Sequence, residues 1–320
     1  MTLTYSLRLF CLLLVVAGLV DVALQLALST SARFLLRRVE AAGSRRRERI
    51  LYLVQAAPAL LAIFLAGALC LPEYLRYEPT HEIEPVGWIT LLLAAAVVIW
   101  FGAALFRGLR MTLRTLCFAR LCRQSGRVVR HSGSIPVLVL AEPAPPLGVL
   151  GFIRPFIGIS ADLLGAGGLN SRALQVALDH ERSHALHFDN WKLLSLCFLP
   201  RLHRDSWLRH WQHAADCAAD DDAACGDAAR SLLLAEALVR TARLVKPSRP
   251  LVICSALTSA ETRLAVRVDR LLRPRRVHRS TGNALLLGLA ALAVLAVGAA
   301  IVATPWVYTA SERILHLGGS

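Results

Sequence analysis

The chain has 320 residues and a formal net charge of +14, and 56% of its residues are hydrophobic. This apolar content excludes an ordinary soluble domain and predicts a membrane protein, so we expect a lipid bilayer as a partner. The arginine clusters could attract nucleic acid, but they border the apolar runs, where membrane topology and anionic headgroups account for them. We therefore expect no direct nucleic-acid binding.

Four apolar runs are long enough to cross a bilayer as helices, at about residues 9–28, 50–71, 88–106 and 284–303. They divide the chain into a three-span membrane domain, a long polar domain, a fourth span and a short tail. The expected boundaries of these parts are 1–107, 108–281, 282–304 and 305–320. Asp21 lies inside the first run, and we expect it to pair with a neighbour such as Arg8 or Gln25 rather than to have a function of its own.

Arginine predicts the orientation of the spans. The loop after the first run holds seven Arg and two Glu, whereas residues 72–87 hold four Glu and one Arg. Arginine also flanks the polar domain on both sides. The positive-inside rule then places the polar domain in the cytoplasm and both termini outside.

The first half of the polar domain predicts a helix followed by a small sheet. Residues 113–124 form a helical pattern that stops at Ser125-Gly126, and strand-like segments follow at 134–140 and 149–159. Proline cannot donate to a strand ladder, so Pro155 favours an edge position. The segment Phe152, Ile153, Arg154 and Pro155 could be an edge strand that aligns a substrate, or a plain structural hairpin.

The stretch His180-Glu181-Arg182-Ser183-His184 is the main candidate for chemistry. It follows apolar residues in a segment without Gly or Pro from Arg172 to Leu199, which predicts a helix starting after an N-cap at Ser171. Residues four apart share a helix face, so His180 and His184 can bind one zinc ion. Glu181 can then reach a water on the metal and act as general base.

A third ligand is expected from a second helix, which contains His213-Ala-Ala-Asp216-Cys-Ala-Ala-Asp220. Asp216 is the expected ligand, and Asp220, four residues later, is expected to orient a ligand histidine. His210 or His213 could take the place of Asp216 if that side chain points away. His187 lies three residues after His184 and off its stripe, so we expect it to face solvent or substrate rather than metal.

These motifs resemble the membrane metallopeptidases of the BlaR/MecR type, which sense beta-lactams in bacteria. The family pattern is His-Glu-x-x-His, an Asp five residues later, here Asp189, and a Glu-x-x-Ala/Cys-Asp helix. Gly148 to Ser160 also resembles the family's Gly-x-x-x-Pro-x-Ile segment. This chain departs by carrying Asp216 where the family has Glu, which requires its helix to lie about 1 to 1.5 Å closer.

The resemblance implies a mainly α fold: four transmembrane helices, with a cytoplasmic α+β, gluzincin-like zinc metallopeptidase domain between spans three and four. It implies one Zn²⁺ per chain, regulatory proteolysis of a protein such as a transcriptional repressor, and a location in the bacterial inner membrane. Asp189 is expected to orient a ligand. Arg267 matches a recurrent Arg that could steady a carboxylate or act on the substrate side, but a plain membrane-proximal charge is favoured.

Antibiotic-sensing members carry a penicillin-binding domain after the last span, and residues 305–320 show no counterpart. We therefore expect a transducer and protease without that sensor, and a partner sensor protein or a homodimer stays open. Two other functions also stay open. One is a non-proteolytic scaffold or signal transducer with a structural metal site, and the other is a membrane-protein quality-control protease.

Overall fold

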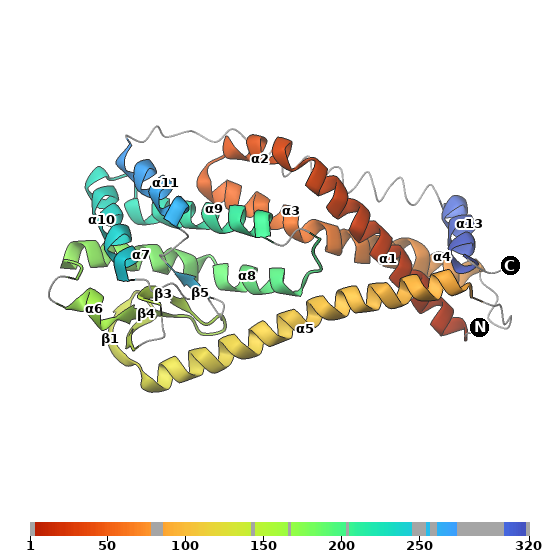
Figure 1. Ribbon diagram of the computed structural model, residues 1–320, viewed down its shortest axis with the longest axis horizontal. Coiled ribbons are helices and arrows are strands. Elements are labelled where there is room, and N and C mark those ends of the chain that lie inside the picture. Colours follow the sequence, from red (N-terminus) through yellow and green to blue (C-terminus); the bar gives the residue numbers. More distant parts are fainter. Residues whose placement is uncertain are drawn as a thin grey trace.

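The computed structural model describes residues 4–77, 86–141, 145–165, 168–202, 205–244, 254–256, 261–273 and 304–317. In these ranges the chain is mainly helical, with one small mixed sheet (Figure 1). Three helices are long and apolar enough to cross a membrane, and they span Tyr5–Thr30, Ser44–Arg76 and Trp88–Ser125. They contain the first three expected spans, whereas the expected fourth span at 284–303 lies outside the described residues.

The three long apolar helices meet α4 and α13 at one end of the molecule, on the right in Figure 1. The elements of this part of the chain are α1 (Tyr5–Thr30), α2 (Ala32–Glu40), α3 (Ser44–Leu65), the π-helical turn η1 (Ala66–Cys70), α4 (Leu71–Tyr77), α5 (Trp88–Ser125) and α13 (Thr304–Leu315). Inside α1, the Asp21 carboxylate accepts hydrogen bonds from Gln25 Nε2 at 2.8 Å and Trp100 Nε1 at 3.2 Å. The expected pairing with Gln25 is therefore confirmed.

Most of the tail expected at residues 305–320 forms helix α13. It packs against α1, α4 and η1, beside the N-terminus (Figure 1). The Gly87 amide at the start of α5 donates to the Leu315 carbonyl at 2.9 Å. A Cβ atom at Gly87 would overlap the backbone of Leu317, so only glycine allows this approach.

Helix α5 connects the membrane helices with the sheet. Its 38 residues correspond to a length of about 57 Å, and it ends at Ser125, as the sequence predicts. Strand β1 begins two residues later. One continuous helix therefore carries the chain from the membrane region to the sheet, as Figure 1 shows.

The sheet has the strand order β1-β2-β4-β3-β5, in which β2 and β4 are parallel and the other pairs are antiparallel. Its strands are β1 (Arg127–Ser132), β2 (Ile135–Leu140), β3 (Leu147–Leu150), β4 (Phe156–Ser160) and β5 (Cys254–Ala256). Strands thus flank Arg154 and Pro155, as expected. The prediction of an edge strand at Phe152 to Pro155 is wrong, because these residues form the loop between β3 and β4. Their backbone leaves the ladder at Gly151, whose φ of +77° favours glycine.

Helices cover the sheet and complete the second half of the molecule. They are α6 (Ala161–Leu164), α7 (Ser171–Leu186), α8 (Asp189–Phe198), α9 (Asp205–Ala224), α10 (Ala228–Leu244) and α11 (Glu261–Leu272). Helix α7 packs on the sheet with buried residues that include Val176, Ala177 and Leu178. Its N-cap is Asn170, whose side chain accepts from the Ala173 amide, rather than the expected Ser171.

Helix α9 lies between α7 and the membrane helix α3. Small side chains allow this close packing, because six alanines of α9 are at most 2% exposed: Ala214, Ala215, Ala218, Ala219, Ala223 and Ala224. On the α3 side, Trp207 and Trp211 pack with Ile50 and Leu51. The second membrane helix is therefore part of the core beneath the candidate site.

Candidate metal centre

His180 and His184 point the same ring nitrogen toward one place. Both lie on α7, one turn apart, and their Nε2 atoms are 3.2 Å from each other. Two nitrogens bound to a tetrahedral zinc ion at about 2.0 to 2.1 Å lie about 3.3 Å apart. The two imidazoles thus have the spacing that a shared metal ion requires.

Asp216 on α9 faces this pair from the neighbouring helix. Its Oδ1 is 3.7 Å from His184 Nε2, and its side chain is 12% exposed. Among the described residues, no three His, Cys, Asp or Glu side chains surround one point closely enough to hold an ion as they stand. His180, His184 and Asp216 have donor types that fit zinc, but the carboxylate lies further from His184 Nε2 than two ligands of one ion would.

Each imidazole has a carboxylate behind it. His184 Nδ1 shares a hydrogen bond of 2.7 Å with Asp189 Oδ2, whereas His180 Nδ1 lies 3.1 Å from Asp220 Oδ1 without the alignment of a hydrogen bond. A carboxylate on Nδ1 favours the tautomer that leaves Nε2 free for a metal. Phe188 makes the contact of Asp189 possible, because its left-handed backbone (φ 57°) ends α7 and turns Asp189 back toward His184.

Glu181 lies beside the pair with both carboxylate oxygens buried, and the backbone amide of Val149 faces it. Burial, reinforced by the charge of Asp216, raises the pKa of Glu181 to about 7, against the opposing effects of His184, Arg267 and the Val149 amide. Burying a carboxylate with so few polar neighbours is costly. Its pKa near neutrality suits a group that takes up and returns a proton.

The two histidines differ in their affinity for a proton. Burial lowers the pKa of His180 to about 4, although Asp220 opposes the shift. For His184 burial acts in the same direction, but the hydrogen bond and charge of Asp189 outweigh it and raise the pKa to about 9. His180 is therefore neutral at pH 7, whereas His184 carries a proton there.

Arg267 on α11 is part of the centre. Its side chain is fully buried, and its Nε and Nη2 donate to the two oxygens of Asp220 at 2.9 and 2.6 Å. Burial lowers the pKa of the guanidinium, but Asp220 and Asp216 raise it overall. The favoured expectation of a membrane-proximal charge is wrong, because the amphipathic helix α11 turns this residue inward.

No protein-family model matches the chain, and no curated protein matches its sequence. The resemblance to BlaR/MecR-type peptidases thus rests on the motifs alone.

His187 lies at the margin of the centre rather than among the ligands. Its side chain is 35% exposed, and its Nε2 is 3.4 Å from Asp222 Oδ2. Burial lowers its pKa. This position is compatible with the expected solvent or substrate side.

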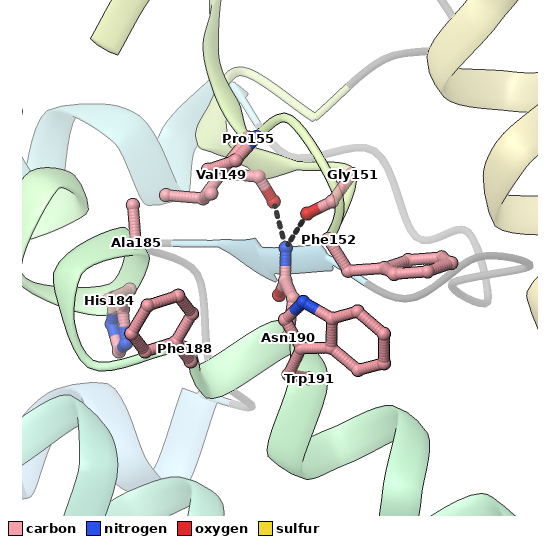
Figure 2. A pocket seen from close by; sticks show the side chains of 9 residues that line it. All are labelled: Val149, Gly151, Phe152, Pro155, His184, Ala185, Phe188, Asn190 and Trp191. Carbon is pink, nitrogen blue, oxygen red and sulfur yellow. Dashed lines mark hydrogen bonds between the residues drawn. The ribbon is translucent and has the colours of Figure 1, made fainter. Parts of the chain in front are cut away.

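A small, shallow apolar hollow lies next to His184 (Figure 2). Phe152 and Trp191 form one wall, with ring centroids 5.0 Å apart and planes at 76°. Asn190 forms its floor, because the Asn190 amide donates to the carbonyls of Val149 and Gly151 at 3.1 and 2.8 Å. The β3–β4 loop thus lines the hollow although it is not a strand.

The sequence did not reveal a set of polar residues around the centre. Arg45 and Glu48 of α3 reach it from the membrane helix, and Lys192 and Ser183 meet them from α8 and α7. Lys192 lies three residues after Asp189, about one helical turn away. This spacing is the sequence feature that could have predicted their ion pair. Glu48 gives no such signal, because its partner is 144 residues away.

Proposed function

We propose that this chain is a membrane-embedded, zinc-dependent endopeptidase that cleaves a protein substrate. The observation that carries the proposal is the fully buried carboxylate of Glu181, which lies beside two imidazoles with convergent nitrogens. By the motif resemblance, the substrate is a transcriptional repressor or another regulator.

Each residue of the centre has a distinct role in this proposal. A bound zinc ion would supply a Lewis acid able to polarise a carbonyl and lower the pKa of a water. His180, His184 and Asp216 would hold the ion. Glu181 takes the proton from the attacking water and returns it to the leaving amine. Asp220 and Asp189 fix the two rings through Nδ1.

The surroundings of the centre fit a polypeptide substrate. The apolar surface beside His184, formed by Phe152, Phe188 and Trp191, offers a contact for an apolar side chain next to the cleaved bond. Exclusion of water from such a surface strengthens the polar interactions of the neighbouring centre.

We place the protein in a bacterial inner membrane, with four spans, the peptidase half in the cytoplasm and both termini outside. The arginine distribution supports this orientation. Helices α11 and α13 lie at opposite ends of the molecule (Figure 1), and residues 284–303 between them are long and apolar enough for one crossing.

The test compares the detergent-purified wild type with Glu181→Gln and His184→Ala. The wild type should bind about one zinc ion per chain and cut an unfolded peptide library, with the products read by mass spectrometry. Glu181→Gln should keep the zinc and lose cleavage by about 100-fold or more. His184→Ala should lose both.

Glu236→Gln is the matched control, because Glu236 makes a partly exposed pair with Arg240 on α10. It should keep zinc and cleavage at the level of the wild type. Cleavage that survives Glu181→Gln would overturn the assigned role of Glu181.

One observation favours a non-proteolytic scaffold or transducer as the second candidate. Arg267 Nη2 is 3.5 Å from His180 Nε2, and Arg267 Nη1 is 3.6 Å from Asp216 Oδ2. A cation this close can balance the buried carboxylates by itself, without a metal. Wild-type protein without zinc and without peptidase activity would support this candidate.

A further inference from the structure

The first residues of the membrane helix α3 make polar contacts with α7, α9 and α11, the helices that form the candidate metal centre. Arg45 Nη2 donates to Ser183 Oγ at 2.9 Å and to Asp222 Oδ2 at 2.6 Å. Ser183 lies inside the His-Glu-x-x-His stretch. Ser44 Oγ accepts from Arg270 of α11 at 2.8 Å. These contacts fix the end of α3 against α7, α9 and α11.

Glu48, the fifth residue of α3, is connected to a predicted zinc ligand. Glu48 Oε1 accepts from Lys192 Nζ at 2.9 Å, and the same ammonium donates to Asp189 Oδ1 at 3.0 Å. The other oxygen of Asp189 is 2.7 Å from His184 Nδ1. An unbroken series of charged contacts therefore runs from a membrane helix to an imidazole of the centre.

Glu48 is fully buried, which is unusual for a glutamate near the end of a membrane helix. Trp211 Nε1 of α9 also donates to its Oε1 at 3.1 Å, and Arg45 Nη1 lies 3.9 Å from its Oε2. Burying a carboxylate is costly, and a neutral packed side chain is often equally stable at such a position. Stability alone therefore does not explain why a charge is present here.

We propose that Glu48 is a positioning residue of the metal centre, acting through Lys192 and Asp189 on His184. This inference rests on the proposed zinc function. In the centre, Lys192 balances two carboxylates at once, so Asp189 can keep its second oxygen on the imidazole. The membrane helix α3 thereby sets the orientation of one ligand.

Removal of the Glu48 charge should break the bridge that Lys192 forms between Glu48 and Asp189. Lys192 is 21% exposed, so its ammonium can turn toward solvent or bind Asp189 alone. Either change weakens the hold of Asp189 on His184. Loss of a direct carboxylate partner costs about 10- to 100-fold in metal affinity. We expect a smaller loss of roughly three- to tenfold for Glu48, one contact further out.

The experiment measures zinc affinity of the full-length protein in detergent by competition with a chelator. The variants are Glu48→Gln, Lys192→Met and the two combined. Each single variant should bind zinc roughly three- to tenfold more weakly than the wild type. The double variant should be no weaker than either single variant, because both substitutions break the same series of contacts.

Glu40→Gln is the matched control, since Glu40 is an exposed carboxylate of the neighbouring helix α2. It should bind zinc as the wild type does.

If a single variant does not fold, the double variant decides, because it leaves neither an unpaired glutamate nor an unpaired lysine. A double variant with wild-type zinc affinity, or single effects that simply add, would overturn the proposal.

The outcomes separate this inference from the function on which it rests. Wild-type protein that binds no zinc would remove the metal centre, and the positioning role with it. Wild-type protein that binds zinc, with unchanged affinity after Glu48→Gln, would remove only the positioning role.

Discussion

The two imidazoles of the centre are supported from different sides of the molecule. Behind His180 are Asp220 and Arg267, which are both fully buried and both belong to the helices around the sheet. Behind His184 are Asp189 and Lys192, and the next contact, Glu48, comes from a membrane helix. The support of His180 is thus buried within the helices around the sheet, whereas the support of His184 extends to a membrane helix.

The two supports should differ in rigidity: the contacts behind His180 are fixed, and those behind His184 can change. A buried pair with two parallel hydrogen bonds, such as Arg267 with Asp220, holds one geometry. A series that includes the partly exposed Lys192 can change when a helix moves. We therefore expect disturbance of the His180 side to affect folding, and disturbance of the His184 side to affect metal affinity.

The largest effect is expected from Arg267→Met. This substitution leaves the Asp220 carboxylate buried without its cation, which should lower the free energy of unfolding by about 3 to 5 kcal/mol. Thermal unfolding in detergent measures the change. Arg273→Met is the control, because the pair of Arg273 with Asp269 is 74% and 57% exposed and contributes little. Equal stabilities of the two variants would contradict the local role of Arg267.

Asp189→Asn should act on the metal with less effect on folding. The amide keeps the shape but removes the charge that holds His184, so zinc affinity should fall about 10- to 100-fold. Chelator competition measures it. Asp179→Asn is the matched control, because Asp179 precedes His180 but pairs with Arg230 at 2.7 Å. A similar loss in both variants would show that the effect is not specific to Asp189.

The pH dependence of zinc binding should show the same asymmetry. His184 has its pKa raised to about 9, so below that pH a proton competes with the metal, whereas His180, with a pKa of about 4, is already free of its proton at neutrality. Zinc affinity should therefore rise about tenfold per pH unit from pH 7 to 9 and level off above. Asp189→Asn should move the levelling point to lower pH. A wild-type profile that is flat between pH 7 and 9 would contradict the assignment.

The sequence predicted the elements whose patterns are local. Three apolar runs, the helix with the His-Glu-x-x-His stretch and the end of α5 at Ser125 follow from hydropathy, helical spacing and breaker residues. His180 and His184 share a face because they lie four apart on α7, and so do Asp216 and Asp220 on α9. That α9 packs against α7 is a contact between distant segments.

What the sequence could not predict depends on contacts between distant segments. Arg267 looks like one of several arginines on an amphipathic helix, and only packing of α11 shows that it is buried. The loop at Phe152 to Pro155 looks like a strand because the apolar residues on both sides belong to real strands. Glu48 and Lys192 are 144 residues apart, and no local pattern connects them.

The alanines of α9 restrict how this sequence can change over time. Asp216 reaches His184 because α9 lies close to α7, and α9 can lie there because the alanines have no bulk to hold it away. A larger residue at one of these alanines would move α9 away from α7 and draw the aspartate further from His184. The aspartate and the small residues around it should therefore be inherited together.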